Sequence, residues 1–274
     1  MVKHILRSAA LAVAACALAA TAFAQEVDFK DPTGDDNGPG TYTYPTDPVY
    51  KPGSFDITGV KITQKGDKVT FAVSVNSDIE NPWAMPDPAN FSVQMIFIHV
   101  NTGKGAITKG VPGTNVQFAK GNGWDRVVVL SPQPAGRVKA EFRDKAADLL
   151  PALVVPEDTT AEGRTIHGTV DLKAMGGGSV TKWRYQVLMQ SNEGFPDKHD
   201  VLTRKVNEYE GQHRFGGGND GDCDPHVMDL LAGKAVGDKG EIDAQHKMLA
   251  YQCNPDGTSK KPATLTLVSP PKKK

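Results

Sequence analysis

Short segments with an alternating apolar pattern, each bounded by Gly, Pro, Asn or Asp, recur along the chain and limit the folds that it can adopt. In residues 68–75 every second residue is Val or Phe, and this period of two predicts a strand with one buried face. The preceding Gly66-Asp67 pair predicts a hairpin turn. The same signals predict further strands at residues 55–63, 91–100, 124–130, 137–142, 164–172, 181–190 and 264–268.

These strands favour an all-β fold, a single immunoglobulin-like β-sandwich with long loops rich in Gly and Asp and with little helix. Residues 25–54 are rich in Gly, Asn and Pro, which exclude a helix or a central strand there. Two short helical pieces are expected. One is a short helix or loop at residues 146–153, and the other is one or two helical turns at 225–232, with Asp224 as N-cap and Pro225 in the first turn.

The N-terminal segment has the features of an export signal. Lys3 and Arg7 precede an apolar stretch that ends in Ala22-Phe23-Ala24, a small-x-small cleavage pattern. We therefore expect a signal peptide at residues 1–24 and export to the periplasm or the cell surface. Lipidation of Cys16 and retention as a membrane anchor are the alternatives, but the apolar run is short for a span.

The mature chain is expected to form one domain, residues 25–268, followed by a basic tail, residues 269–274, because neither a linker nor an internal repeat interrupts it. Cleavage after Ala24 leaves two cysteines, Cys223 and Cys253. In an oxidising compartment two such thiols usually pair. We therefore predict a disulfide between them, the alternative being two free thiols.

Charge and motifs exclude several classes of function. Lys plus Arg number 31 and Asp plus Glu 32, a net charge of −1, which argues against a nucleic-acid binder with a broad basic face. The sequence has no GxSxG elbow, P-loop, GxGxxG or HExxH motif. A non-catalytic protein is favoured, with a small secreted hydrolase as a weaker alternative.

Oxygen-bearing side chains gather in two glycine-rich segments, one early and one late in the mature chain. Ca²⁺ takes roughly six to eight oxygen ligands in flexible geometry, so together the segments suggest a structural calcium site; alternatively, these residues only form turns. The early residues are Asp31, Asp35, Asp36 and Asn37, and the late ones are Asn219, Asp220, Asp222 and Asp224. The candidate metal ligands are Asp35, Asp36, Asp220, Asp222 and Asp224.

Aromatic residues in predicted loops suggest a sugar-binding surface. Pyranose rings have apolar CH faces and hydroxyl rims, so they are bound by exposed aromatic rings beside charged groups. Trp83 and Trp124 are the candidate stacking platforms, with Asp125 and Arg126 as partners for hydroxyl groups. Trp183, which lies in a predicted strand, is expected in the core.

Met95 and His99 support an alternative. Both residues lie on one face of a predicted strand, and a Met/His pair can ligate a b-type haem. The alternative function is therefore a periplasmic electron-transfer protein. Such residues are more often a core Met and a surface His.

Several sequence blocks follow one another in the order of a known family. They are GDDNGPGTYTYPTD at 34–47, GSFDI at 53–57, NPW at 81–83, FSVQ at 91–94, GWDR at 123–126, RFGGGNDG at 214–221 and DPHVMDLL at 224–231. These blocks resemble the glucodextranase C-terminal domain family. The resemblance implies a DOMON-like β-sandwich and a non-catalytic module, associated with secreted amylolytic enzymes, that binds carbohydrate or attaches to the cell surface. Related DOMON domains bind sugar or b-type haem, so the alternative stays open.

Overall fold

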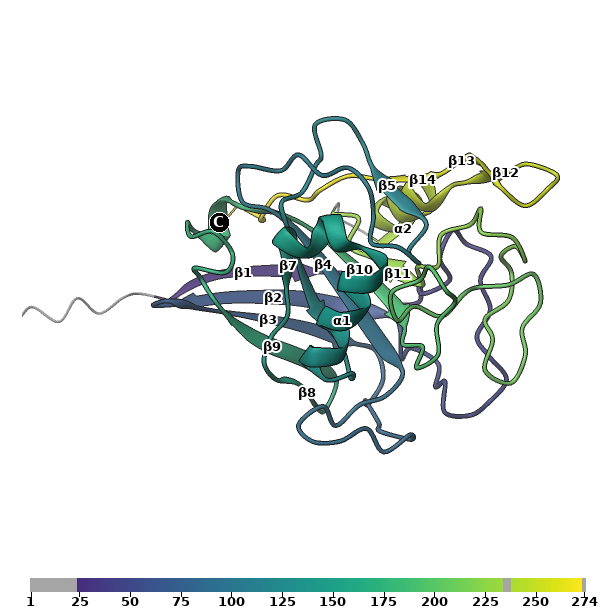
Figure 1. The fold of residues 1–274 in the computed structure, drawn as a ribbon, viewed down its shortest axis with the longest axis horizontal. Helices are drawn as coiled ribbons and strands as arrows, with labels where there is room; N and C mark the ends of the chain where they lie inside the picture. The colour runs from purple at the N-terminus through teal and green to yellow at the C-terminus, as the bar shows by residue number, and fades with distance from the viewer. Residues whose placement is uncertain (1–23, 234–237, 273–274) are drawn as a thin grey trace, which may run out of the picture.

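Two five-stranded sheets face each other in the computed structural model, which describes residues 24–233 and 238–272 (Figure 1). The predicted all-β sandwich is confirmed. The predicted signal peptide, with Cys16, lies outside the described residues apart from Ala24. None of the helices in the described ranges is long and apolar enough to cross a membrane.

The first sheet is antiparallel throughout. Its hairpin at Gly66 is confirmed, since Lys65 pairs with Lys68 and Gly66 has a φ of 61°. A short edge strand, β1 (Gln25–Lys30), opens the segment in which a helix or a central strand was excluded, so this exclusion holds. The strand order is β1 (Gln25–Lys30), β2 (Ile57–Lys65), β3 (Lys68–Val75), β9 (Thr165–Asp171) and β8 (Thr159–Glu162).

The second sheet is centred on β4, whose side chains are buried on both faces. This confirms the long apolar strand predicted from residues 91–100. Only the β6–β7 pair is parallel among its ladders. The strand order is β11 (Asp229–Leu230), β10 (Arg184–Ser191), β4 (Gln94–Asn101), β6 (Arg126–Leu130) and β7 (Leu153–Val154).

Alternate side chains of β4 enter two different cores. Ile96 and Ile98 lie in the first core, between the two sheets, and Trp183 is buried there as expected. Met95 and Phe97 enter a second core on the other face of the second sheet. The elements that cover this second core are α1 (Ala135–Lys145), η1 (Ala147–Ala152), β5 (Val116–Phe118), α2 (Asp238–Leu249) and β14 (Ala263–Leu265).

Two local predictions were wrong. Residues 137–142 lie in α1 and not in a strand, because Val138 and Phe142, one helical turn apart, are buried together against the second sheet. Residues 225–232 are not helical but contain the short strand β11, which pairs with β10. Of the short helix or loop expected at 146–153, the structure has the helix, the 3-10 helix η1.

The remaining elements are short and lie around the sandwich. The strand predicted at 264–268 is divided between β14 and an isolated bridge from Val268 to Tyr185. Helix α2 was not predicted from the sequence. The other elements are η2 (Val180–Lys182) and the hairpin of β12 (Gln252–Cys253) with β13 (Ser259–Lys261).

Candidate functional site

Two long loops, residues 31–56 and 192–228, lie together at one end of the sandwich (Figure 1, right). The amide of Gly38 donates to the Met228 carbonyl at 2.8 Å, and Thr43 and Gly216 form an antiparallel bridge. The early and late segments noted in the sequence are therefore neighbours in space. We call this region the loop end.

Trp83 lies at the loop end with 37% of its surface exposed. Its ring meets Tyr50 edge-on at a centroid distance of 6.0 Å and His213 at 6.3 Å. The guanidinium carbon of Arg204 lies 5.9 Å from the Trp83 ring centroid, within the range of a cation–π interaction. These contacts hold the indole in place while part of it faces solvent.

Arg204 is itself positioned by two polar contacts. Its Nη1 donates to the His213 carbonyl at 2.7 Å, and it forms an ion pair with Glu193 at 3.0 Å. Both side chains line a surface depression together with His213 and Phe195, whose side chain is 93% exposed. We call Trp83, Glu193, Phe195, Arg204 and His213 the Trp83 surface. It presents aromatic rings, a guanidinium group, a carboxylate and an imidazole.

Trp124 is completely buried, which corrects the prediction that it forms an exposed platform. Its Nε1 donates to the Lys109 carbonyl at 3.0 Å, and its ring packs against His99 at 4.9 Å. Asp125 accepts hydrogen bonds from the Thr102 amide and hydroxyl. Of the three residues predicted to bind sugar together with Trp83, two, Trp124 and Asp125, therefore make their contacts within the fold.

Arg126 is also distant from Trp83. Its Nε donates to the Ala174 carbonyl at 3.0 Å, and the residue pairs with Val100 near the end of β4. The Trp83 amide instead bonds the hydroxyl of Ser92, which precedes β4. At about 3.3 Å per residue, the extended chain from Ser92 to Val100 spans roughly 25 Å. The structure thus does not bring the predicted sugar ligands together.

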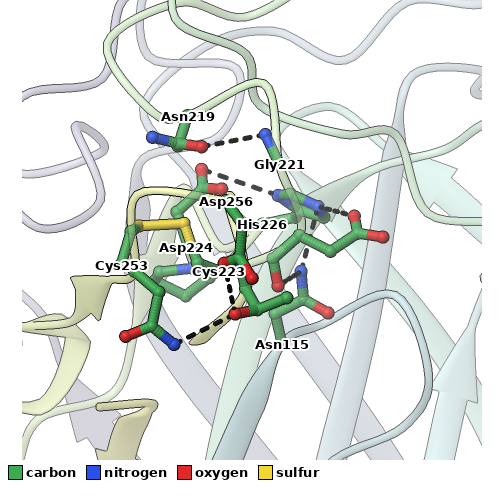
Figure 2. The surroundings of a disulfide bond; sticks show 12 residues. Asn115, Asn219, Gly221, Cys223, Asp224, His226, Cys253 and Asp256 are labelled. Carbon is green, nitrogen blue, oxygen red and sulfur yellow. Dashed lines mark hydrogen bonds and ion pairs between the residues drawn. A yellow bond between two sulfur atoms is a disulfide. The ribbon is translucent and has the colours of Figure 1, made fainter. Parts of the chain in front are cut away.

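The late acidic residues have partners within the protein. Asp222 lies 2.7 Å from the Lys205 Nζ, and hydrogen bonds from His226 and Lys205 hold the pKa of Asp222 well below its ordinary value. Asp220 accepts the Glu208 amide at 3.0 Å. Figure 2 shows Asp224 buried beside the disulfide, where one of its oxygens lies 3.4 Å from the Tyr42 hydroxyl.

The two early candidate ligands point to different surroundings. Asp36 accepts a hydrogen bond from the Tyr44 hydroxyl. Asp35 is only 1% exposed and lies beside Asp31 and Asp229, with one carboxylate oxygen of each within 4.8 Å of the others. Of the five predicted metal ligands, Asp35 alone belongs to this group.

Two further carboxyl groups lie next to Asp31, Asp35 and Asp229. Asp56 directly precedes β2, and Glu241 lies in the unpredicted helix α2; both raise the pKa of Asp35 by charge repulsion, after the larger effect of burial. We call these five residues the carboxylate cluster. Its members are separated by up to 210 positions in the sequence, so spacing could not reveal it. Asp31 and Asp35 were noted among the early oxygen-bearing residues, whereas Asp56, Asp229 and Glu241 were not.

The predicted disulfide is confirmed. Cys223 and Cys253 are bonded, with a Cα–Cα distance of 5.4 Å. The bond joins the late loop to β12 (Figure 2). Beside it, the Asn115 amide nitrogen lies 3.2 Å from His226 Nε2.

Met95 and His99 are both core residues. Each is completely buried, and the His99 ring lies 4.8 Å from the Phe118 ring. They project from the same side of β4 about 13 Å apart, whereas two axial haem ligands must meet at one iron atom. The haem alternative therefore gains no support from the described residues.

A comparison with protein families matches residues 27–268 to the C-terminal binding module, SLH-like, of glucodextranase. No curated protein matches the sequence at a significant level. The family match covers both sheets, the loop end and the disulfide. Because it spans nearly the whole chain, the protein belongs to the family of the SLH-like C-terminal binding module of glucodextranase.

Proposed function

We propose that this protein is an exported, non-catalytic module that binds a cell-envelope or α-glucan polysaccharide through the Trp83 surface. The family is described as a binding module, and the N-terminal 24 residues have the pattern of a cleavable signal. The observation that carries the proposal is the partly exposed Trp83, held between Tyr50, His213 and Arg204.

The chemistry of the Trp83 surface suits a sugar. The exposed part of the indole offers an apolar face to pyranose CH groups, and Phe195 adds a second, more exposed ring. Glu193 accepts hydrogen bonds from hydroxyl groups, whereas Arg204 donates to sugar oxygens. Since Arg204 and Glu193 are already paired, little side-chain entropy remains to be lost on binding.

Binding is tested with the mature protein, residues 25–274, on an array of α-glucans and envelope polysaccharides. The best ligand is then titrated calorimetrically against wild type and Trp83→Ala. Loss of an aromatic anchor costs about 1 to 3 kcal/mol, which is roughly a 5- to 150-fold increase in Kd. We expect a change in this range.

Arg204→Lys and Arg126→Lys form a matched pair for the location of the site. Both arginines are half-buried and form ion pairs, but only Arg204 touches Trp83. Arg204→Lys should weaken glycan binding, and Arg126→Lys should leave it unchanged. Full binding by folded Trp83→Ala, or loss in Arg126→Lys alone, would place the glycan site elsewhere.

A further inference from the structure

The carboxylate cluster joins five acidic side chains from separate segments at the loop end. Asp31 follows β1, Asp56 precedes β2, Asp229 lies in β11 and Glu241 lies in α2, whereas Asp35 comes from the first long loop. Asp31 is 8% exposed, Asp35 and Asp56 are 1% exposed, and Asp229 and Glu241 are completely buried. Acidic residues are seldom so buried without a compensating partner.

Six oxygen atoms of this cluster are buried without a hydrogen-bond partner among the described residues. They are both carboxylate oxygens of Asp31, both of Asp35, Oδ1 of Asp56 and Oε2 of Glu241. The other oxygens are occupied: Asp229 accepts the Ile57 and Leu230 amides, Glu241 accepts the Ala232 amide, and Oδ2 of Asp56 accepts the Gly34 amide. Buried polar atoms are nearly always bonded to a protein group, water or an ion, so this set lacks a partner.

The negative charge of the carboxylate cluster is not balanced by a cationic side chain among the described residues. No Lys, Arg or His in residues 24–233 or 240–272 forms an ion pair with any member of the cluster. Carboxylates this close together repel one another when they are ionised unless a positive charge lies between them.

We propose that the carboxylate cluster binds one Ca²⁺ ion, with Asp31, Asp35 and Asp229 as its central ligands and Asp56 and Glu241 beside them. One oxygen from each central residue already lies within 4.8 Å of the others. The set contains oxygen atoms only, which suits a hard cation and not Zn²⁺, which favours His and Cys. Mg²⁺ usually keeps several waters and few carboxylates, whereas Ca²⁺ takes roughly six to eight oxygens.

The proposed ion connects parts of the loop end that are distant in sequence. Gln245 of α2 accepts the Leu230 amide at 2.9 Å and donates to the Asp35 carbonyl, so α2 already rests on the same segments as the cluster. A cation there would hold the start of the first long loop to β11 and α2. The site replaces the predicted loop ligands Asp36, Asp220, Asp222 and Asp224, and its existence does not depend on glycan binding.

The test measures Ca²⁺ binding and thermal stability of the chelator-treated mature protein. Calorimetric titration with CaCl₂ should show one ion per chain, and Ca²⁺ should raise the melting temperature because it binds only the folded state. Asp31→Asn should weaken binding at least tenfold and abolish the rise in melting temperature. Asp220→Asn, in the exposed loop, is the matched control and should behave like wild type.

The variants also separate lost binding from misfolding. Without Ca²⁺, Asp31→Asn and Asp35→Asn should melt no lower than wild type, because each removes one charge from a repelling group. A lower melting temperature of both variants in chelator would overturn the proposal, since the carboxyl groups would then be protonated partners that stabilise the fold. The absence of stoichiometric Ca²⁺ binding, equal stabilisation by Mg²⁺, or loss of binding in Asp220→Asn alone would also overturn it.

Discussion

At the scale of single residues, His99 shows how burial decides what a side chain can do. Both ring nitrogens are buried without a hydrogen-bond partner among the described residues, and the ring lies between Phe118 and Trp124. Desolvation lowers the pKa of His99 to about 3, so it is neutral at physiological pH. The residue therefore packs as an aromatic core side chain.

This burial predicts a specific dependence of stability on pH. His99 is neutral in the folded state down to about pH 3, but it gains a proton near pH 6.5 once the chain unfolds. The unfolded state thus binds more protons between these values, and stability falls as pH decreases. From pH 6.5 to 4.5, wild type should lose about 2 kcal/mol relative to His99→Leu.

The measurement is urea unfolding of both proteins at several pH values, and the difference between their free energies of unfolding is the quantity of interest. Taking the difference cancels the contributions of the carboxylate cluster. Parallel pH curves for the two proteins would show that His99 can be protonated without unfolding.

At the scale of elements, the period of the apolar residues separates the correct predictions from the wrong ones. In β3 alternate residues are buried, as predicted for a strand. In α1 the buried residues Val138 and Phe142 are four apart, a spacing that fits both a strand of period two and a helix. The good helix formers in residues 135–145 favour the helix. The helix packs on the face of the second sheet that points away from the first sheet.

Substitutions in α1 test this arrangement. Phe142 is completely buried in the second core, so Phe142→Ala should lower the free energy of unfolding by about 3 to 5 kcal/mol. Lys139 lies on the exposed side of the same helix, and Lys139→Ala should change it by less than about 0.5 kcal/mol. Guanidinium unfolding followed by tryptophan fluorescence measures both; equal effects would contradict the observed orientation of the helix.

At the scale of the whole molecule, several long-range contacts hold the loop end together. The Tyr42 hydroxyl donates to the Pro225 carbonyl at 2.5 Å, and the disulfide ties Cys223 to Cys253 across 30 positions. The Trp83 surface and the carboxylate cluster lie at this same end, where β1 ends and β2 and β4 begin. Stability of the loop end therefore bears on both proposals.

Removal of the disulfide should destabilise the whole domain. Closing a loop of 30 residues is worth about 3 to 4 kcal/mol in the chain-entropy model. The double variant Cys223→Ala/Cys253→Ala should lose that amount in urea unfolding. In a parallel assay, denatured but unreduced mature protein should show no free thiol; two titratable thiols would contradict the bond.

The sequence by itself determined the β-sandwich class and the long central strands, the turn at Gly66, the pairing of Cys223 with Cys253 and the burial of Trp183. These features depend on local periodicity, on turn chemistry or on the absence of any other cysteine in residues 25–274, and each can be read within a short segment or by counting. The family resemblance likewise rested on contiguous blocks, and the match over residues 27–268 confirms it.

Only the tertiary structure decided which of these residues meet. Trp83 and Trp124 occupy similar turn-rich segments, but the structure partly exposes Trp83 and buries Trp124. Trp83 lies beside the start of β4 at the loop end, whereas Trp124 lies in the second core. Likewise, Asp31, Asp229 and Glu241 come together only when β1, β11 and α2 pack at one end of the sandwich. Burial and electrostatic repulsion depend on distances in space, which residue spacing along the chain does not contain.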